Sequence, residues 1–215
     1  MPMSYDPPQT SLDVLYEDAH VIAVNKPAGL LSVPGKGPDL HDCLLTRLQA
    51  AFPDTLLVHR LDRDTSGVMI FALTPHAQRV LSKTFELRKA RKTYVARVWG
   101  RLQPRTGRVD LPLAVDWPNR PRQMVDTENG RPAATDWRVV KDAEAETRVR
   151  LFPHTGRSHQ LRVHMLSLGH PILGDPLYAT GPAAEFPRMM LHSEELRLSH
   201  PENGKGLKFR AAPEF

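Results

Sequence analysis

The sequence predicts an α+β protein built on a mainly antiparallel, mixed sheet with flanking helices. Strand-like segments outnumber helical ones, and there is no regular alternation of strand, helix and strand. Twenty prolines are scattered over 215 residues, which favours many short elements joined by rigid loops. A chain of this length buries enough apolar surface to fold without disulfides, and its one cysteine, Cys43, can form none within the chain.

Apolar or alternating segments bounded by turn residues predict the strands. Two strands with a turn at 17–19 are expected within 12–27, and a fully buried strand is expected at 67–73. Further strands are predicted at 92–100, 108–116, 133–140, 147–152, 191–200 and 205–211. The strands at 133–140 and 147–152 are expected to form a hairpin around 142–146.

Helical spacing of apolar residues predicts three helices. The first covers 40–51, with Asp39 as its N-cap and its leucines on one face. The second follows Thr74, an N-cap residue, with Pro75 at its first position. The third lies within 157–169, where Leu161, Met165 and Leu168 form an apolar stripe and Gly169 ends the helix. Met165 and Leu168 are expected in the core.

The bulk composition limits the setting and the partners. The lone cysteine fits a reducing, cytosolic compartment, and the N-terminal residues lack the pattern of a signal peptide. No apolar run approaches the length of a membrane span. The formal net charge of +5 favours a polyanionic partner such as nucleic acid, although a mildly basic balance is also common in small bacterial proteins.

The stretch VHRLDRDTSG, residues 58–67, places many charges directly before the buried strand. Asp62 has three possible roles: it can form a turn, it can bind a metal together with Asp64, or it can act as a nucleophile or base. Thr65, Ser66 and Gly67 can form a polar turn that holds the Asp62 carboxylate. Together with an arginine, such donors would keep it ionised at neutral pH.

A second cluster of polar residues lies at 151–170. It carries the four imidazoles of His154, His159, His164 and His170, but no HExxH motif and no nearby cysteine, so a zinc site is not favoured. The alternative is that Arg157 and Arg162 contact phosphate or a carboxylate while the histidines anchor loops or helix ends.

Two further basic segments suit RNA. Residues 88–92 hold two arginines and two lysines directly before the predicted strand that carries Tyr94, and basic residues beside an aromatic can bind RNA with unstacked bases. The proline-rich stretch 116–123 adds Arg120 and Arg122, which suit phosphate binding. Solubility alone is the competing explanation for this loop.

Five segments in order along the chain resemble the RluA family of pseudouridine synthases. HRLDRDTSG at 59–67 resembles the family signature HRLD-x-x-TSG, which is long and specific. The other segments are NKPAGLLSVPG at 25–35, RKTYVARVWG at 91–100, TGRSHQLRVHM at 155–165 and GHPILGDPLY at 169–178. The resemblance implies the pseudouridine synthase fold with a central catalytic cleft, an N-terminal extension at 1–11, and one catalytic domain at 12–215 without an S4 domain.

The resemblance also implies an activity and a site. The enzyme would isomerise a uridine in structured RNA to pseudouridine by flipping the base out of the stack. Asp62 would be the catalytic carboxylate, Tyr94 would stack on the uracil, Arg162 would pair with Asp62, and Arg60 would enter the RNA stack. Further RNA contacts are expected from His59, Lys92, Arg120, Arg122 and Arg157.

The resemblance leaves some points open and implies others only by analogy. No metal or other cofactor and no obligate protein partner is expected, and the enzyme is expected to be a cytoplasmic monomer that does not bind membranes. The target is a hairpin-loop uridine of 23S rRNA, of the tRNA anticodon arm, or both. Whether Asp62 attacks C1′, attacks C6 or forms a glycal stays open. The rival functions are RNA binding without catalysis and a metal-dependent hydrolase that uses Asp62, Asp64 and some of the histidines.

Overall fold

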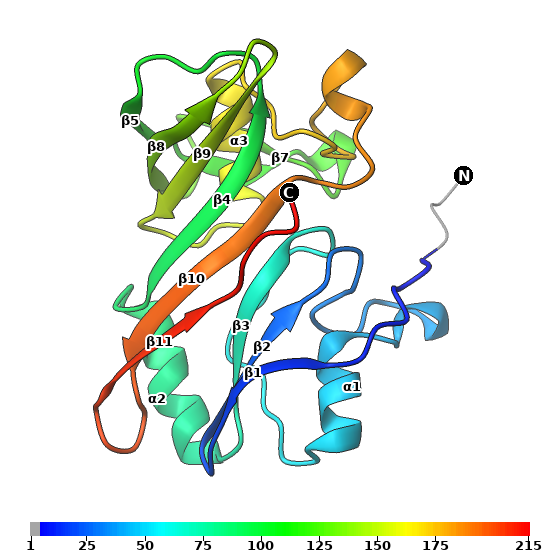
Figure 1. Cartoon of the computed structure of the whole chain (residues 1–215), viewed down its shortest axis with the longest axis vertical. Helices are drawn as coiled ribbons and strands as arrows, with labels where there is room; N and C mark the ends of the chain where they lie inside the picture. Colours follow the sequence, from blue (N-terminus) through cyan, green and yellow to red (C-terminus); the bar gives the residue numbers. More distant parts are fainter. Residues whose placement is uncertain (1–4) are drawn as a thin grey trace. The chain divides into compact units, whose positions relative to one another are not determined.

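The computed structural model describes residues 5–215, which form two compact units (Figure 1). The first unit runs to residue 92 and resumes over 193–214, and the second holds residues 93–192 together with Phe215. The catalytic domain predicted for 12–215 thus comprises two units. Residues 1–4 of the predicted extension lie outside the described residues, and the first strand begins at Asp13, as expected.

The first unit is built on a sheet in the order β1–β2–β3–β10, with β11 paired to β10. Its strands are β1 (Asp13–Glu17), β2 (Val21–Lys26), β3 (Ser66–Ala72), the part of β10 (Leu191–Ser199) from residue 193 onward, and β11 (Gly206–Arg210). The pairs β1–β2, β2–β3 and β10–β11 are antiparallel, and every residue of β3 is buried.

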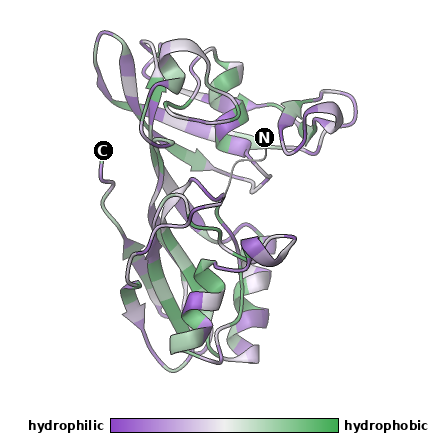
Figure 2. Cartoon of the chain, turned by 90° about the vertical axis from the view of Figure 1, so that its right-hand side faces the viewer, coloured by the Kyte–Doolittle hydropathy of each residue, from purple (hydrophilic) through white to green (hydrophobic). Residues whose placement is uncertain are grey.

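Helix α2 (Pro75–Glu86) begins as predicted, because the Thr74 hydroxyl accepts the Ala77 N–H at 3.1 Å. Ala77 and Leu81 of this helix join the apolar core of the first unit. Figure 2 shows the resulting pattern: the strands of this unit are largely hydrophobic, whereas its helices carry hydrophobic and hydrophilic residues on different faces.

Helix α1 (Leu44–Ala51) starts four residues later than predicted, and Asp39 is not its N-cap. Asp39 lies in the short 3-10 helix η1 (Pro38–Leu40). The cap is Cys43, whose sulfur accepts the Thr46 N–H while the Thr46 hydroxyl accepts the Cys43 N–H at 3.1 Å. This reciprocal pair satisfies donors that a helix beginning at residue 40 would have bonded internally.

The second unit contains a sheet in the order β4–β9–β8–β5 and a separate β6–β7 hairpin, all antiparallel. Its elements are β4 (Arg91–Trp99), β5 (Thr106–Asp110), β6 (Leu113–Val115), η2 (Trp117–Asn119), β7 (Gln123–Val125), β8 (Ala134–Asp142), β9 (Glu146–Pro153), α3 (Gln160–Ser167) and η3 (Gly181–Ala184). The β8–β9 hairpin agrees with the prediction, as does the α+β class as a whole.

Two predictions for the second unit were wrong in detail. The strand predicted at 108–116 is two strands, β5 and β6, because Pro112 has no N–H to continue the ladder and the chain turns to pair with β7. In α3, Leu161 and Met165 are buried, the latter as expected, but Leu168 follows the last helical turn and is 36% exposed.

Gly67, at the start of β3, is required by both its backbone angle and its surroundings. Its φ is +110°, and a Cβ atom there would lie 2.3 Å from the Ser193 carbonyl oxygen on the neighbouring strand. Only glycine allows β3 and β10 to approach this closely. The last letter of the sequence signature therefore has a packing role.

We predict that Gly67→Ala lowers the free energy of unfolding by at least about 3 kcal/mol, because backbone strain and a steric clash add together. The matched control is Gly204→Ala, which also has a positive φ (+70°) but no atom within 4 Å of the added Cβ. It should cost only about 1–2 kcal/mol. If urea denaturation gave the same loss of unfolding free energy for both variants, the close approach of β10 would not be what requires glycine at residue 67.

Candidate active site

The segment that carries Asp62 is a turn that leads directly into β3. The Thr65 N–H donates to the Asp62 carbonyl at 3.2 Å, which closes the turn, and Leu61 before it is 6% exposed. Asp62 itself is half-buried. Arg63 forms an ion pair with Asp64 at 2.8 Å within the same turn. Asp64 thus has a partner of its own, which argues against a metal site shared by the two aspartates.

Lys26, at the end of β2, anchors this turn. The antiparallel pairing of β2 and β3 places Lys26 opposite Gly67, so the end of one strand lies beside the start of the other. The Lys26 ammonium is completely buried and donates to the carbonyl oxygens of Pro27 at 2.9 Å, Leu30 at 2.7 Å and Arg63 at 2.8 Å. One cation therefore ties the loop after β2 to the turn that carries Asp62.

Ser32 adds a second link between the same two segments. Its hydroxyl donates to the Leu61 carbonyl at 2.7 Å and accepts the Leu61 N–H at 3.2 Å. The Gly29 N–H also donates to the Arg63 carbonyl at 3.0 Å. Lys26 and Ser32 lie in the segment NKPAGLLSVPG at 25–35, but the sequence pattern gave neither residue a role. The sequence did contain a signal for Lys26, because a lysine at the end of a strand of buried apolar residues needs polar partners.

His59 and Arg60, which precede Asp62, differ in their surroundings. The His59 ring stacks on Phe85 with the centroids 4.4 Å apart, and its Nε2 accepts the Ile70 N–H at 3.1 Å. Burial, with a smaller contribution from the Lys92 charge, lowers the pKa of His59 to about 3. His59 is therefore a neutral acceptor that positions the backbone. Arg60, one residue later, is exposed to solvent.

Lys92 completes the predicted residues of the first unit. It is half-buried on β4, and burial lowers the pKa of its ammonium. Four of the predicted site residues, His59, Arg60, Asp62 and Lys92, thus belong to this unit.

The second unit holds the other five predicted residues. Tyr94 lies on β4 opposite Leu151 of β9, and its half-buried ring packs against the main core of this unit. Arg162 lies on α3, where its side chain is 3% exposed. Its Nε and Nη2 each donate to one Asp175 carboxylate oxygen at 2.7 Å, which is a bidentate ion pair.

Asp175 and Tyr178 form the support for Arg162. Asp175 is completely buried, and its Oδ1 also accepts the N–H groups of Leu177 at 2.9 Å and Tyr178 at 3.2 Å. The guanidinium of Arg162 lies 4.9 Å from the Tyr178 ring centroid, and that of Arg122 lies 5.2 Å from it. Burial raises the pKa of Tyr178. Both residues occur in the quoted segment 169–178, yet the sequence gave them no role.

The Tyr178 hydroxyl connects two loops. It accepts the Gln123 N–H at 2.7 Å and lies 2.7 Å from Nδ1 of His159, the left-handed residue (φ +54°) before α3. Arg122 is thereby held beside Tyr178 through its neighbour Gln123. The structure therefore brings together Arg122 and Arg162, which the sequence assigned to RNA binding and to catalysis respectively.

The remaining two arginines lie on exposed or half-exposed loops of the second unit. Arg120 is exposed, and its guanidinium lies 4.7 Å from the ring centroid of Trp117. Arg157 precedes α3, and its Nε donates to the Pro132 carbonyl at 3.1 Å. Both arginines are thus oriented by contacts with their own unit.

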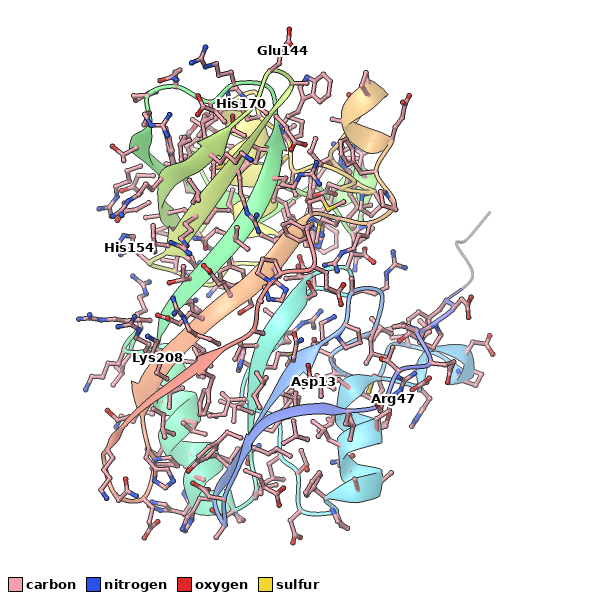
Figure 3. All side chains as sticks on the ribbon, in the orientation of Figure 1. Asp13, Arg47, Glu144, His154, His170 and Lys208 are labelled. Atoms are coloured by element: carbon pink, nitrogen blue, oxygen red, sulfur yellow. The ribbon has the colours of Figure 1, made fainter. Side chains whose placement is uncertain are left out.

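The four histidines at 154–170 do not form a metal site. His154 pairs with Asp136 at 2.6 Å, whereas Nδ1 of His170 lies 2.7 Å from the Trp99 carbonyl, and Figure 3 shows these two residues in separate places. His164 lies between the Thr135 hydroxyl and the Leu111 carbonyl. Over residues 5–215, no three histidine, cysteine or acidic side chains are grouped to hold a metal ion. No helix in the same range is long and apolar enough to cross a membrane.

A family model and curated relatives match the chain. The model described as RNA pseudouridylate synthase matches residues 20–167. The chain is 53% identical over 215 residues to a protein named dual-specificity RNA pseudouridine synthase RluA from Escherichia coli K12, covering 99% of this chain and 98% of that protein. A protein of the same name from Vibrio cholerae is 53% identical over 201 residues, covering 93% of this chain and 82% of its own.

Solved structures agree with the fold. The structure named Human RNA Pseudouridylate Synthase Domain Containing 1 has a TM-score of 0.82 and 29% identity, covering 98% of this chain and 87% of that chain. Human RNA Pseudouridylate Synthase Domain Containing 4, with a TM-score of 0.75 and 24% identity, covers 94% and 88% and shows the same fold. The predicted family resemblance is confirmed.

We predict that Lys26→Met lowers the free energy of unfolding by about 3 kcal/mol or more, because three buried carbonyl groups lose a charged donor. Lys83→Met, on the exposed side of α2, is the matched control and should change stability by less than about 0.5 kcal/mol. Urea denaturation measures both. A loss below about 1 kcal/mol for Lys26→Met would contradict the anchoring role.

We also predict that the His59 imidazole stays neutral from pH 8 down to about pH 4, because its pKa is lowered to about 3. The unfolded chain binds a proton at His59 near pH 6.5, so this residue makes the folded state lose stability as pH falls from about 6.5 toward 3. NMR titration of the ring protons should show no shift in this window. His59→Gln keeps a hydrogen-bond acceptor and should reduce by about one the number of protons that the chain takes up on unfolding in this pH range. An imidazole that titrates near pH 6.5 in the folded protein would refute the assignment.

Proposed function

The chain belongs to the RNA pseudouridylate synthase family, and from this membership we propose how its residues convert uridine to pseudouridine. The protein is an isomerase that acts on RNA. The reaction breaks the bond between N1 of uracil and C1′ of ribose and joins C5 to C1′ instead. C5 loses its hydrogen and N1 gains one, so no net oxidation occurs.

Asp62 is the catalytic carboxylate in this proposal. The observation that carries it is the fixed turn between Leu61 and β3, which is closed by Thr65 and anchored by the buried Lys26 ammonium. A carboxylate on so rigid a backbone is already positioned toward one atom of a bound nucleotide, so no conformational entropy is lost in ordering it at each turnover. It would act as a nucleophile or as a base on the flipped uridine.

Arg162 and Tyr94 are assigned to the same uridine as Asp62. The two bonds between Arg162 and Asp175 fix the plane of the guanidinium, and such a plane can present a second edge to another carboxylate. Tyr94 offers an aromatic face for the uracil ring after the glycosidic bond is broken. Under this proposal, residues 12–215 work as a single catalytic domain.

Arg60 and four further residues are assigned to the RNA. Arg60 is exposed two residues before Asp62, which suits a planar cation that fills the space left by the flipped uridine. Arg120, Arg122 and Arg157 are assigned to phosphate contacts and Lys92 to the RNA backbone. His59 was predicted as a further RNA contact, but we propose instead that it positions the backbone, because its ring stacks on Phe85 and accepts the Ile70 N–H.

The proposed targets are one uridine in a hairpin loop of 23S rRNA and one in the tRNA anticodon arm. Support comes from the nearly full-length match to enzymes that are named dual-specificity. A site that serves two RNAs has to recognise the shape of a loop, since the paired regions differ. We further propose a cytoplasmic enzyme that works as a monomer, without a cofactor and without an obligate protein partner or membrane.

The decisive test is release of tritium from RNA labelled at C5 of uridine, with EDTA present. Asp62→Asn is nearly isosteric and should reduce release by at least about a thousandfold, because the charge that attacks or accepts a proton is gone. RNA affinity should stay within about threefold of wild type. Unmodified tRNA and a 23S rRNA fragment, assayed separately, identify the target.

Asp64→Asn is the matched control, because it makes the same change in the same turn at a residue that pairs with Arg63. It should retain most of the tritium release. Wild-type turnover by Asp62→Asn would exclude Asp62 as the catalytic group. Loss of all release on addition of EDTA would favour a metal-dependent mechanism.

A further inference from the structure

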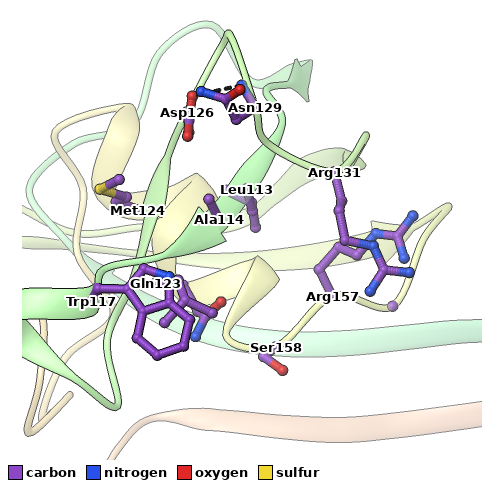
Figure 4. Close-up of a pocket in the computed structure, with 12 residues that line it drawn as sticks. Leu113, Ala114, Trp117, Gln123, Met124, Asp126, Asn129, Arg131, Arg157 and Ser158 are labelled. Atoms are coloured by element: carbon purple, nitrogen blue, oxygen red, sulfur yellow. Dashed lines mark hydrogen bonds between the residues drawn. The ribbon is translucent and has the colours of Figure 1, made fainter.

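The second unit contains a cavity of about 620 Å³ that is lined by none of the residues proposed for catalysis, although Arg157, a proposed phosphate contact, is part of its lining (Figure 4). It lies beside the β6–β7 hairpin and the segment 156–158 before α3. Asp62, Tyr94 and Arg162 are not among its lining residues. The cavity is large enough for one nucleotide and far too small for a duplex.

One wall of the cavity is an aromatic ring held in place. Trp117 is 69% exposed, which is unusual for the largest apolar side chain. The Arg120 guanidinium lies 4.7 Å from the ring centroid of Trp117 and so restrains the indole. Leu113 and Met124 add apolar surface to the lining, and Met124 is 42% exposed. A planar apolar group can therefore stack on the exposed indole.

The other end of the cavity is cationic. Figure 4 shows the guanidinium groups of Arg131 and Arg157 on the same side of the cavity and Trp117 on the opposite side. The backbone of Arg131 is fixed by two hydrogen bonds with Leu113, at 2.8 and 3.0 Å. Arg157 is oriented by its Nε bond to the Pro132 carbonyl. Two guanidinium groups on the same side of the cavity are suited to bind a phosphate.

The one acidic residue of the lining is engaged within its own turn. Asp126 Oδ1 accepts the N–H groups of Glu128 at 3.0 Å and Asn129 at 2.9 Å. The lining therefore has one carboxylate against two guanidinium groups and favours an anion. Gln123, Asn129 and Ser158 supply polar atoms that can meet the edge of a nucleobase.

We propose that this cavity binds one unstacked nucleotide of the RNA substrate, other than the uridine that is isomerised. Its base stacks on Trp117, and its phosphate lies on Arg131 and Arg157. The proposal rests on the proposed function for the class of ligand, because an RNA loop supplies both the unstacked base and the phosphate. A second bound nucleotide would let the enzyme recognise a loop by its shape.

The test is a double-mutant cycle between the protein and the RNA. In a hairpin substrate, each loop nucleotide other than the target uridine is replaced in turn by an abasic one, and the affinity is measured for wild type and Trp117→Ala. At one position the abasic change should weaken binding to wild type about five- to hundredfold and binding to Trp117→Ala less than twofold. Trp117→Phe, which keeps an aromatic face, should recover part of the effect.

Val140→Ala is the matched control for this cycle. Val140 is an apolar residue of the same unit, 44% exposed on β8 and absent from the lining. The abasic effect should persist in this variant. Abasic effects that are the same in wild type and Trp117→Ala at every position would overturn the proposal.

The phosphate contact has a separate readout in the salt dependence of binding. Arg131→Gln should reduce the slope of log affinity against log salt by about one ion, whereas Lys141→Gln, on the exposed part of β8, should leave it unchanged. An unchanged slope for Arg131→Gln would overturn the phosphate contact. Quenching of Trp117 fluorescence by a free mononucleotide that does not compete with the hairpin would overturn the assignment to RNA.

The proposed function is tested apart from the cavity. Tritium release by the wild type reports isomerisation whatever the cavity binds, and the cycle reports nucleotide binding whether or not tritium is released. Val140→Ala should keep wild-type kcat and KM, and Trp117→Ala should raise KM about tenfold. A wild type that binds the hairpin with the expected Trp117 coupling but releases no tritium would refute only the catalytic proposal.

Discussion

The buried ammonium of Lys26 is the interaction on which the geometry of the first unit depends. Three carbonyl oxygens surround it, and they come from the loop after β2 and from the turn that holds Asp62. A buried charge is tolerated only when its donors are satisfied, so the three carbonyls and the cation stabilise one another. The turn cannot move without breaking the hydrogen bond between Lys26 and the Arg63 carbonyl, so the backbone of Asp62 is held in place as well.

The second unit uses a different device for the same purpose. The bidentate pair of Arg162 and Asp175 is almost fully buried, and removing one member of such a pair usually costs about 3–5 kcal/mol. Tyr178 lies against Arg162 and Arg122 and binds His159 and Gln123 through its hydroxyl. Helix α3 and the β7 segment are thereby fixed to one buried ring. An enzyme that must hold a flipped base gains from side chains that are ordered before the RNA arrives.

Several elements follow from local sequence patterns alone. Apolar or alternating segments located the strands β1, β2, β3, β8 and β9, and the pair Thr74–Pro75 marked the start of α2 correctly. The errors arose where a second local feature, rather than the apolar spacing, set the boundary of an element. Asp39 is an acceptable cap in isolation, but the reciprocal bonds of Cys43 and Thr46 set the start of α1. Pro112 ended a strand that its apolar neighbours would have continued.

By itself, the sequence determined the family, the isomerase activity on RNA, and the candidate residues, because the motif segments occur together in order along the chain. The tertiary structure decided what supports those residues: the carbonyl partners of Lys26, the pairing of Arg162 with Asp175, and the cavity beside Trp117. Local spacing encodes strands and helices because their hydrogen bonds and side-chain faces repeat over a few residues. Arg162 and Asp175 are 13 residues apart, Lys26 and Arg63 are 37 apart, and Tyr178 and Gln123 are 55 apart, so only folding determines that these groups meet.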